Sequence, residues 1–378
     1  MIIGIDGNEA NVEKRVGIGE YAYELLRQFE SSRVQNLEFR IYLKNLPMGH
    51  MPKEREGWRY KVIGPNKMWT QFALPLYLFS EKVRRPFRKG TPPQVFFSPS
   101  HYAPRFSPIP TAISIMDLSY IHFPELFTKH DLYQLVNWTK YSAKNARKIF
   151  TISNFSRDDI IKTYGKDPEN VVTTYLGIKS QKTINNKQNM DELEKKFGID
   201  GKYILFVGTL QPRKNVEKLV EAFSKIKDKK IKLVVVGKKG WLWEGIVGAP
   251  ERYKVTERVK FLDFVGDEDL PSLYKNATCF VLPSLYEGFG LPVLEAMQQG
   301  CPVLISNVSS LPEVGGDAAV YFDPENTDDI AKKIDQVLSD EKLRQEMIEK
   351  GYNQIKKFSW EKTARKTLEV LQELAKND

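Results

Sequence analysis

The feature that most constrains the fold is a repeated alternation of short apolar runs with longer amphipathic segments. In the second half, runs such as KYILFVG, IKLVVVG and TCFVLPS are separated by helical patterns such as NVEKLVEAFSKIKD. Near-continuous apolar strands that alternate with helices are typical of parallel sheets covered by helices on both faces. The chain is therefore expected to belong to the α/β class.

The alternation runs through the chain twice, which predicts two sheets. With 378 residues the chain is long enough for two domains of ordinary size. The strands expected in the first half are Ile2–Asp6, Glu38–Leu43, Tyr60–Ile63, Gln94–Ser98, Thr111–Met116, Lys148–Ile152 and Val171–Tyr175. Those expected in the second half lie in KYILFVG, IKLVVVG, RVKFLDF, TCFVLPS, CPVLIS and AAVYF.

A polar segment separates the two halves. Residues 180–200 are poor in large apolar side chains until a helical pattern near their end, and we interpret them as a linker. The prediction is an N-terminal Rossmann-like domain over 1–179 and a C-terminal one over 201–359, both doubly wound. Such sheets bind ligands at the carboxyl ends of their strands, so we expect the two sheets to face each other across a cleft.

Charge and cysteine content restrict the partners and the compartment. The formal net charge of +9 suits phosphorylated substrates, nucleic acid or anionic lipid surfaces. No nucleic-acid-binding module is recognisable, so nucleic acid is not expected. Cys279 and Cys301 lie in apolar runs and are interpreted as buried, reduced thiols of a cytoplasmic protein. We recognise no signal peptide and no apolar run of membrane-spanning length.

One apolar and basic segment is equally consistent with two interpretations. An apolar stretch from Trp69 to Phe79 is followed by RRPFRK (Arg84–Lys89). The pair could rest on an anionic membrane surface, or it could be a core segment followed by a solvated loop.

The sequence EGFGLPVLEAMQQGCPV carries the most specific pattern. Pro292 fits the first turn of a helix that runs to about Gln299 and is closed by Gly300. The first-turn N–H groups have no intrahelical partner, and the helix dipole favours negative charge there. The residues 288–291 before the helix add further amides that a ligand could approach closely. The pattern predicts a phosphate-binding turn.

Two glutamates flank that turn with seven residues between them. Glu295 is expected at the end of the first helical turn, where its carboxylate could accept hydrogen bonds from two vicinal ribose hydroxyls. Glu287 precedes the turn and would face a sugar. Each alone is as consistent with a structural role, and the combination favours function.

A bound pyrophosphate needs compensating charge, and the sequence offers two sources. Arg213 and Lys214 lie in a strand-to-helix loop, where two cations could neutralise a leaving diphosphate without a metal ion. Asp267-Glu268-Asp269 has the Asp-x-Asp form of metal-dependent sugar transferases. We favour a helix cap for this second segment, because Pro271 follows early in a short helical pattern.

Gly17 and Gly19 open a helix after the first strand and could donate amides to phosphate, although this signal is weak alone. The loop is too long for a dinucleotide fingerprint, and no complete G-x-G-x-x-G is present, which argues against a dehydrogenase.

Taken together, these motifs resemble the family 4 glycosyltransferases, which are retaining enzymes of GT-B architecture. The segments that carry the resemblance are EGFGLPVLEAMQQGCPV, VGTLQPRKN, GIGEYAYELL, TISNFSRDDI and FSWEKTARKTLEVL. It runs essentially end to end and is most specific from Tyr203 to Asp323. It implies a GT-B fold and metal-independent sugar transfer from a nucleotide diphosphosugar, with no cofactor. It also implies that the N-terminal domain binds the acceptor, and that the helix over 360–378 crosses back to that domain.

The resemblance also assigns residues by position. Glu295 would hold the ribose, Glu287 the sugar hydroxyls, and Lys214, helped by Arg213, the diphosphate. The other residues expected at the donor site are Gly17, Gly19, Thr209, Val265, Ser284, Gly288, Phe289, Gly290 and Leu291.

The chain departs from the family pattern at two positions. Thr209 stands where many members have arginine, and Arg213 is expected to replace that charge. Met116 stands where many have the histidine of His-Asp-Leu, and methionine cannot accept a proton. Either the leaving phosphate takes the acceptor's proton, or Asp117, His101 or His122 substitutes, or the chain is a weakly active or non-catalytic relative.

The resulting expectation is a hexosyltransferase, with GDP-mannose as the favoured sugar donor and UDP-glucose as the alternative. A glycan or lipid-linked acceptor at the inner membrane face would fit the 69–89 segment, and the protein would be cytoplasmic or peripheral. Two further alternatives are a sugar-nucleotide-binding protein without turnover and a pyridoxal-phosphate-dependent phosphorylase of the same architecture.

Overall fold

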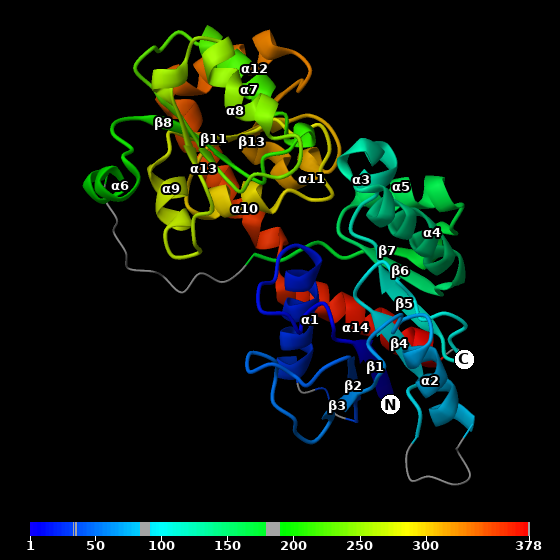
Figure 1. Cartoon of the computed structure of the whole chain (residues 1–378). Helices are drawn as coiled ribbons and strands as arrows, with labels where there is room; N and C mark the ends of the chain where they lie inside the picture. Colours follow the sequence, from blue (N-terminus) through cyan, green and yellow to red (C-terminus); the bar gives the residue numbers. More distant parts are fainter. Residues whose placement is uncertain (33, 35, 84–90, 179–189, 377–378) are drawn as a thin grey trace. The chain divides into compact units, whose positions relative to one another are not determined.

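The computed structural model describes residues 1–32, 34, 36–83, 91–178 and 190–376, and they form two compact units (Figure 1). Unit 1 is Met1–Gly177 with Ser359–Asp378, and unit 2 is Ile178–Phe358. Of the predicted linker, residues 180–189 lie outside the described part of the chain. Helix α6 (Met190–Phe197) occupies most of the remainder.

Unit 1 is built on a parallel sheet of order β3-β2-β1-β4-β5-β6-β7. Its strands are β1 (Ile2–Asp6), β2 (Glu38–Leu43), β3 (Trp58–Val62), β4 (Val95–Ser98), β5 (Thr111–Ser114), β6 (Lys148–Thr151) and β7 (Val171–Thr173). Every residue of β1 and β4 is buried, as expected of central strands covered on both faces. The strand order reverses between β1 and β4, which is the doubly wound arrangement.

Most helices of unit 1 lie in the connections between these parallel strands, and one comes from the C-terminal end of the chain. They are α1 (Ile18–Ser32), α2 (Ala73–Val83), α3 (Ser119–His122), α4 (Lys129–Asn145), α5 (Asn154–Tyr164) and α14 (Trp360–Lys376). Two begin at hydroxyl caps: Thr128 accepts from the Asp131 N–H before α4, and Ser153 accepts from the Ser156 N–H before α5. Such caps satisfy first-turn N–H groups that have no intrahelical partner.

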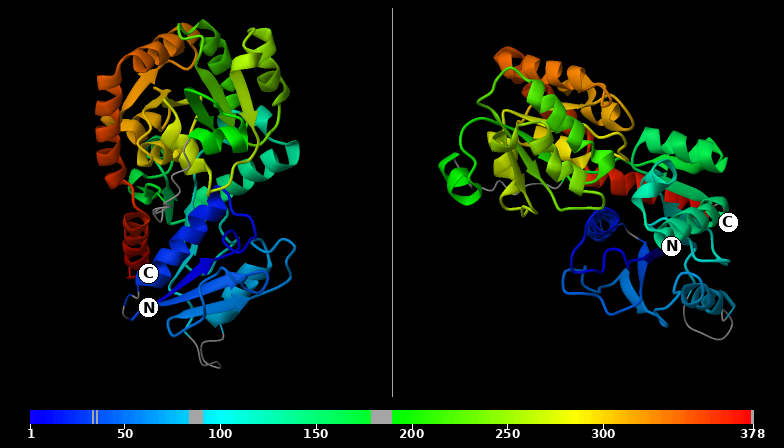
Figure 2. Two further views of the ribbon diagram at one scale, coloured as in Figure 1. Left: turned by 90° about the vertical axis from the view of Figure 1, so that its left-hand side faces the viewer. Right: turned by 45° about the horizontal axis from the view of Figure 1, so that its top comes forward.

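Helix α14 comes from the far end of the chain and packs beside α1 in unit 1 (Figure 2). The rings of Trp360 and Tyr21 lie 6.3 Å apart, and the Thr363 hydroxyl donates to the Tyr175 carbonyl. Gly177 lies against the start of this helix, where a Cβ would be 2.1 Å from the Trp360 nitrogen. Only glycine allows the two backbone segments to approach this closely.

Unit 2 repeats the architecture with a parallel sheet of order β10-β9-β8-β11-β12-β13. Its strands are β8 (Tyr203–Val207), β9 (Lys232–Val236), β10 (Val259–Leu262), β11 (Cys279–Leu282), β12 (Val303–Ser306) and β13 (Ala319–Phe322). Besides α6, its helices are α7 (Val216–Lys225), α8 (Glu244–Arg252), α9 (Leu270–Asn276), α10 (Leu291–Gln298), α11 (Leu311–Gly315), α12 (Thr327–Ser339) and α13 (Glu341–Gln354).

The predicted strands are all present, and the differences lie at their ends. The strand expected over Thr111–Met116 ends at Ser114, and the one expected over Tyr60–Ile63 spans Trp58–Val62. Cys279 and Cys301 are buried and free, as predicted. No helix in the described part of the chain is long and apolar enough to cross a membrane.

Candidate functional site

The strand order of unit 2 reverses between β8 and β11. The chain passes from β8 to β9 on one side, whereas β11 leads to β12 on the other side. At such a reversal the loops after the two strands diverge, and ligands of doubly wound sheets bind there. Arg213 and Lys214 follow β8, and Ser284 and Glu287 follow β11, so both motifs singled out in the sequence meet at this point.

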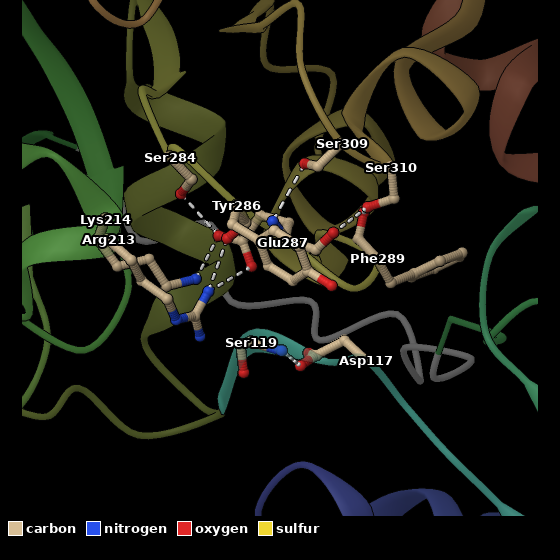
Figure 3. A network of polar contacts seen from close by, with 10 residues as sticks. All are labelled: Asp117, Ser119, Arg213, Lys214, Ser284, Tyr286, Glu287, Phe289, Ser309 and Ser310. Atoms are coloured by element: carbon tan, nitrogen blue, oxygen red, sulfur yellow. Dashed lines mark hydrogen bonds and ion pairs between the residues drawn. The ribbon is translucent and has the colours of Figure 1, made fainter. Parts of the chain in front are cut away.

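The two loops are joined by direct hydrogen bonds (Figure 3). The Leu285 N–H donates to the Arg213 carbonyl at 2.8 Å. In return, the Arg213 guanidinium donates through Nη1 to the Tyr286 carbonyl at 2.8 Å and to Glu287 Oε2 at 3.3 Å. The guanidinium is therefore anchored to the loop after β11 by both backbone and side chain.

Glu287 is the centre of this polar network. Its Oε1 forms an ion pair with Lys214 Nζ and accepts a hydrogen bond of 2.6 Å from the Ser284 hydroxyl. Glu287 is 6% exposed, Lys214 is 8% exposed, and Ser284 is fully buried. Burial alone would raise the carboxyl pKa, but Lys214 and Arg213 outweigh it and lower the pKa of Glu287 to about 2. The group is therefore a buried carboxylate.

The predicted helix follows directly. Helix α10 begins at Leu291 with Pro292 in its first turn, and Gly300 beyond its end has a φ of +69°. Gly290 caps its start with a φ of +101°, and a Cβ there would lie 2.7 Å from the Leu311 side chain. Glycine is required at this turn both for the dihedral and for the space.

Within the 288–291 segment, the Phe289 ring is buried and packs edge-on against Phe358, with centroids 5.6 Å apart. A phosphate at the predicted turn would therefore have to contact the backbone of this segment and not the Phe289 ring. Leu291 is half-buried as the first residue of α10, and Gly288 directly follows Glu287.

Two serines that sequence reasoning missed hold the Glu287–Phe289 backbone. Ser309 Oγ accepts from the Glu287 N–H at 3.1 Å, and Ser310 Oγ donates to the carbonyls of Glu287 at 2.8 Å and Phe289 at 3.0 Å. Both residues lie between β12 and α11, at the carboxyl ends of the strands. Their position after a predicted strand was the only signal that could have indicated them.

Glu295 differs in position from the prediction. It is the fifth residue of α10, and the first turn contains no acidic residue. Its Oε2 accepts a hydrogen bond of 3.0 Å from the hydroxyl of Tyr274 on α9, a fully buried side chain that the sequence did not single out. Glu295 is therefore oriented by a neighbouring helix rather than by the helix N-terminus.

The remaining candidates of unit 2 also lie after the carboxyl ends of its strands. Thr209 is exposed in the turn after β8, and Val265 is buried in the turn after β10. The Asp267-Glu268-Asp269 segment lies at the start of helix α9, as predicted, and Asp269 occupies the N-cap position, although its side chain makes no cap hydrogen bond. Its carboxylate instead accepts from Lys196 Nζ at 2.6 and 2.7 Å, because helix α6 brings that lysine to it.

In unit 1, the two glycines lie in the loop between β1 and α1. Gly17 has a φ of +51°, a conformation that L side chains rarely adopt. Gly19 is the second residue of α1, and a Cβ there would lie 2.9 Å from the Glu9 carbonyl oxygen. The Gly19 N–H donates to the Val16 carbonyl at 3.1 Å, so this amide already has an acceptor in the structure.

The turn after β5 contains Met116, which stands where the resemblance implies a histidine. The Met116 N–H donates to Nε2 of His101 at 3.3 Å, and Asp117 Oδ1 accepts from the Ser119 N–H at 2.9 Å. Burial lowers the pKa of His101 to about 4, with Asp117 acting in the opposite direction. His101 is thus a neutral support of the turn, and Asp117 accepts the hydrogen bond of the first N–H of α3.

His122 is placed differently from the other candidates of unit 1. Its Nε2 lies 2.7 Å from Asp159 Oδ2, which links α3 to α5, and its side chain is 41% exposed. The contact of His122 with Asp159 is therefore that of a structural histidine, which joins two helices by a hydrogen bond.

Sequence comparisons relate this chain to known glycosyltransferases. The sequence model described as "Glycosyl transferases group 1" matches residues 189–354. The O-antigen chain mannosyltransferase B of Escherichia coli is 31% identical over 367 residues, which are 93% of this chain and 94% of that protein. The serotype-specific mannosyltransferase WbdA of Escherichia coli is 32% identical over 262 residues, and these span 64% of this chain but only 32% of that protein.

Solved structures share the whole architecture. Sucrose-phosphate synthase from Thermosynechococcus elongatus superimposes with a TM-score of 0.73 over 100% of both chains, at 17% sequence identity. This likeness confirms the predicted GT-B fold class, in which both domains are Rossmann-like. Because the 31% identity extends over almost the entire chain and the family model covers most of unit 2, the protein belongs to the group 1 glycosyltransferases and is a glycosyltransferase, as its motifs predicted.

Proposed function

We propose that the protein transfers mannose from GDP-mannose to a growing glycan or a lipid-linked acceptor, with retention of anomeric configuration and without a metal ion. The observation that carries the proposal is the Arg213–Lys214–Glu287 cluster at the strand reversal of unit 2. The mannosyl specificity is supported by the similarity to O-antigen chain mannosyltransferase B, and retention by the family resemblance.

The chemistry follows from where negative charge develops. When the bond between the anomeric carbon and the diphosphate breaks, charge accumulates on the leaving phosphate. Arg213, Lys214 and the N-terminus of α10 supply positive charge at one place, and such stabilisation is commonly the largest catalytic contribution. These two side chains would supply the charge that a divalent cation supplies in metal-dependent transferases, so we expect transfer to persist in EDTA.

The proton of the acceptor hydroxyl needs a destination other than the Met116 side chain. In front-face displacement the leaving phosphate can take it directly, and we propose this route. His101 Nε2 is already an acceptor for the Met116 N–H, and Asp117 is already an acceptor for the Ser119 N–H. Both residues are better suited to shaping the turn than to removing the proton.

Calorimetric titration with GDP, UDP and ADP in EDTA, followed by a transfer assay with radiolabelled GDP-mannose, tests the proposal. Tight metal-free binding of GDP and labelled product would support it. Preference for UDP would favour the glucosyltransferase alternative. Binding of GDP with no turnover on any glycan or lipid-linked acceptor would favour a non-catalytic sugar-nucleotide-binding protein. No binding of any of the three would overturn it.

Tyr274→Phe offers a first prediction about the nucleotide. The change removes the phenol that holds Glu295, and hydrogen bonds to charged groups are worth about 1.5–3 kcal/mol. If Glu295 holds the ribose, we expect GDP affinity to fall about tenfold while affinity for inorganic pyrophosphate, which has no ribose, stays unchanged.

Tyr203→Phe is the matched control for this prediction. Its phenol is also buried and donates to the Leu273 carbonyl at 2.6 Å, so the substitution removes an equivalent buried hydroxyl. We expect this variant to lose stability but to keep its affinity for GDP. Equal GDP affinities in Tyr274→Phe and the wild type would contradict the role given to Glu295.

We further propose peripheral attachment to an anionic membrane through the outer face of α2. Phe72, Leu76, Phe79 and Val83 recur at helical spacing and are 56%, 67%, 43% and 72% exposed. The opposite face of the helix is buried through Ala73, Leu74, Pro75 and Leu78, so the part of α2 before Ser80 is apolar on both faces, a pattern typical of helices that contact apolar surroundings on both sides. Lys82 lies in the last turn, and the basic stretch Arg84–Lys89 follows in the sequence, outside the described residues.

A second prediction tests this face. Leu76→Glu places a charge in the stripe and should lower binding to vesicles containing phosphatidylglycerol by about tenfold. Leu46→Glu makes the same change at a 76% exposed leucine of the same unit and should bind like the wild type. Flotation measures both. Unchanged flotation of Leu76→Glu would contradict membrane contact.

A further inference from the structure

The cations proposed to bind the diphosphate already have an anionic partner within the chain. Lys214 and Arg213 are both paired with Glu287, one with each carboxylate oxygen (Figure 3). The pairing spans more than 70 residues of sequence and depends on the adjacency of β8 and β11. The structure therefore contains an anion at the position where the proposed function requires a second anion to bind.

The carboxylate is held firmly in this position. Ser284 donates to the same oxygen that Lys214 contacts, and the backbone on either side of the carboxylate is fixed by Ser309 and Ser310. Glu287 is ionised, since the two cations keep its pKa near 2 despite burial. Two positive charges and one negative charge leave a formal charge of +1 for an incoming phosphate to meet.

A carboxylate and a phosphate oxygen compete for the same N–H groups. Lysine has three N–H donors and arginine has five, so partial sharing is possible, but the Coulomb attraction is divided between two anions that repel each other. Close charge pairs in partly desolvated sites are coupled strongly enough to change an affinity by about tenfold or more. Any diphosphate that binds these cations must therefore weaken their pairing with Glu287.

We infer that Glu287 is an internal competitor of the diphosphate and thereby sets the preference for an intact sugar donor over the released nucleotide diphosphate. This inference rests on the proposed function. A free nucleotide diphosphate displaces the Glu287 carboxylate from the cations, and it has no transferred sugar whose hydroxyls could donate hydrogen bonds to that carboxylate. An intact sugar donor also presents hydroxyl groups, and hydroxyls can donate hydrogen bonds to the displaced carboxylate. The competition thus assists release of the product, whose binding the two cations would otherwise favour.

The test is Glu287→Gln, which keeps the size of the side chain and an acceptor for Ser284 but removes the charge. We expect the variant to bind inorganic pyrophosphate and GDP about tenfold more tightly than the wild type, because the cations are no longer neutralised. The ratio of GDP-mannose affinity to GDP affinity should fall in parallel. Glu244→Gln removes the same charge from an exposed position of unit 2 and should bind both ligands like the wild type.

A second variant keeps the inference testable if Glu287→Gln does not fold. Glu287→Asp keeps the charge but shortens the side chain by one methylene, which draws the carboxylate away from the cations. It should bind pyrophosphate with intermediate affinity. Calorimetry on both variants, with thermal unfolding as a check of the fold, decides the matter.

The outcomes separate the inference from the proposed function. If the wild type binds GDP and neither Glu287 variant binds it more tightly, the competitor role is wrong while the nucleotide site stands. If neither the wild type nor Glu287→Gln binds GDP or pyrophosphate, the proposed function itself is wrong.

Discussion

Lys214→Ala is expected to lower kcat/KM for sugar transfer by about 10²–10³, the usual loss when one preorganised group that stabilises transition-state charge is removed. Lys214 is 8% exposed and lies at the strand reversal beside Arg213, so neither bulk water nor a flexible surface lysine replaces its charge. A steady-state assay with the sugar donor and acceptor measures the effect. Lys202→Ala removes an exposed lysine of the same unit and should retain full activity.

The same substitution should also destabilise the fold, and the two effects can be separated. Removing one partner of a buried ion pair leaves the Glu287 carboxylate with less compensation, which typically destabilises a protein by about 3 kcal/mol. The double variant Lys214→Ala/Glu287→Gln removes both charges, so its stability should largely recover while transfer stays impaired. Full activity in Lys214→Ala would exclude a role for the lysine in stabilising the leaving group.

Gly177→Ala should destabilise unit 1 where α14 begins. A Cβ at this position would lie 2.1 Å from the Trp360 nitrogen and 2.7 Å from the Ser359 carbonyl carbon, and these are backbone atoms that no rotamer change can move. Either the segment after β7 or the start of α14 must shift, and forced overpacking of this kind typically destabilises by about 1–3 kcal/mol and sometimes more. We expect faster amide exchange throughout α14 and a lower unfolding midpoint in urea.

Gly49→Ala is the matched control for this change. A Cβ at Gly49 would meet nothing within 4 Å, and its φ is not positive, so the same methyl group is added without contact. Its unfolding midpoint should equal that of the wild type or rise slightly, since alanine restricts the unfolded chain. If Gly177→Ala also matches the wild type in α14 exchange, the close approach of the two segments is not required for the fold.

The local pattern predicted the strands because each one is a short, nearly continuous apolar run. One strand boundary differs from the prediction where a polar side chain is paired. The strand expected from Gln94 begins at Val95, and the Gln94 side chain accepts from the Ile2 N–H at 2.6 Å. The helix start predicted at the Asp267-Glu268-Asp269 segment is present, but the Asp269 carboxylate accepts hydrogen bonds from Lys196 on helix α6, 73 residues earlier in the chain, instead of from the first turn of α9.

By itself the sequence determined the α/β class, the two Rossmann-like domains and the identity of the charged motifs, because periodicity, helix caps and spacing are local properties of the chain. Tertiary structure decided what those motifs contact. Glu287 pairs with Arg213 and Lys214 because β8 and β11 are neighbours in the sheet, Ser309 and Ser310 hold its backbone because β12 lies beside β11, and Tyr274 orients Glu295 across two helices. Strand order creates these contacts, and no local pattern specifies strand order.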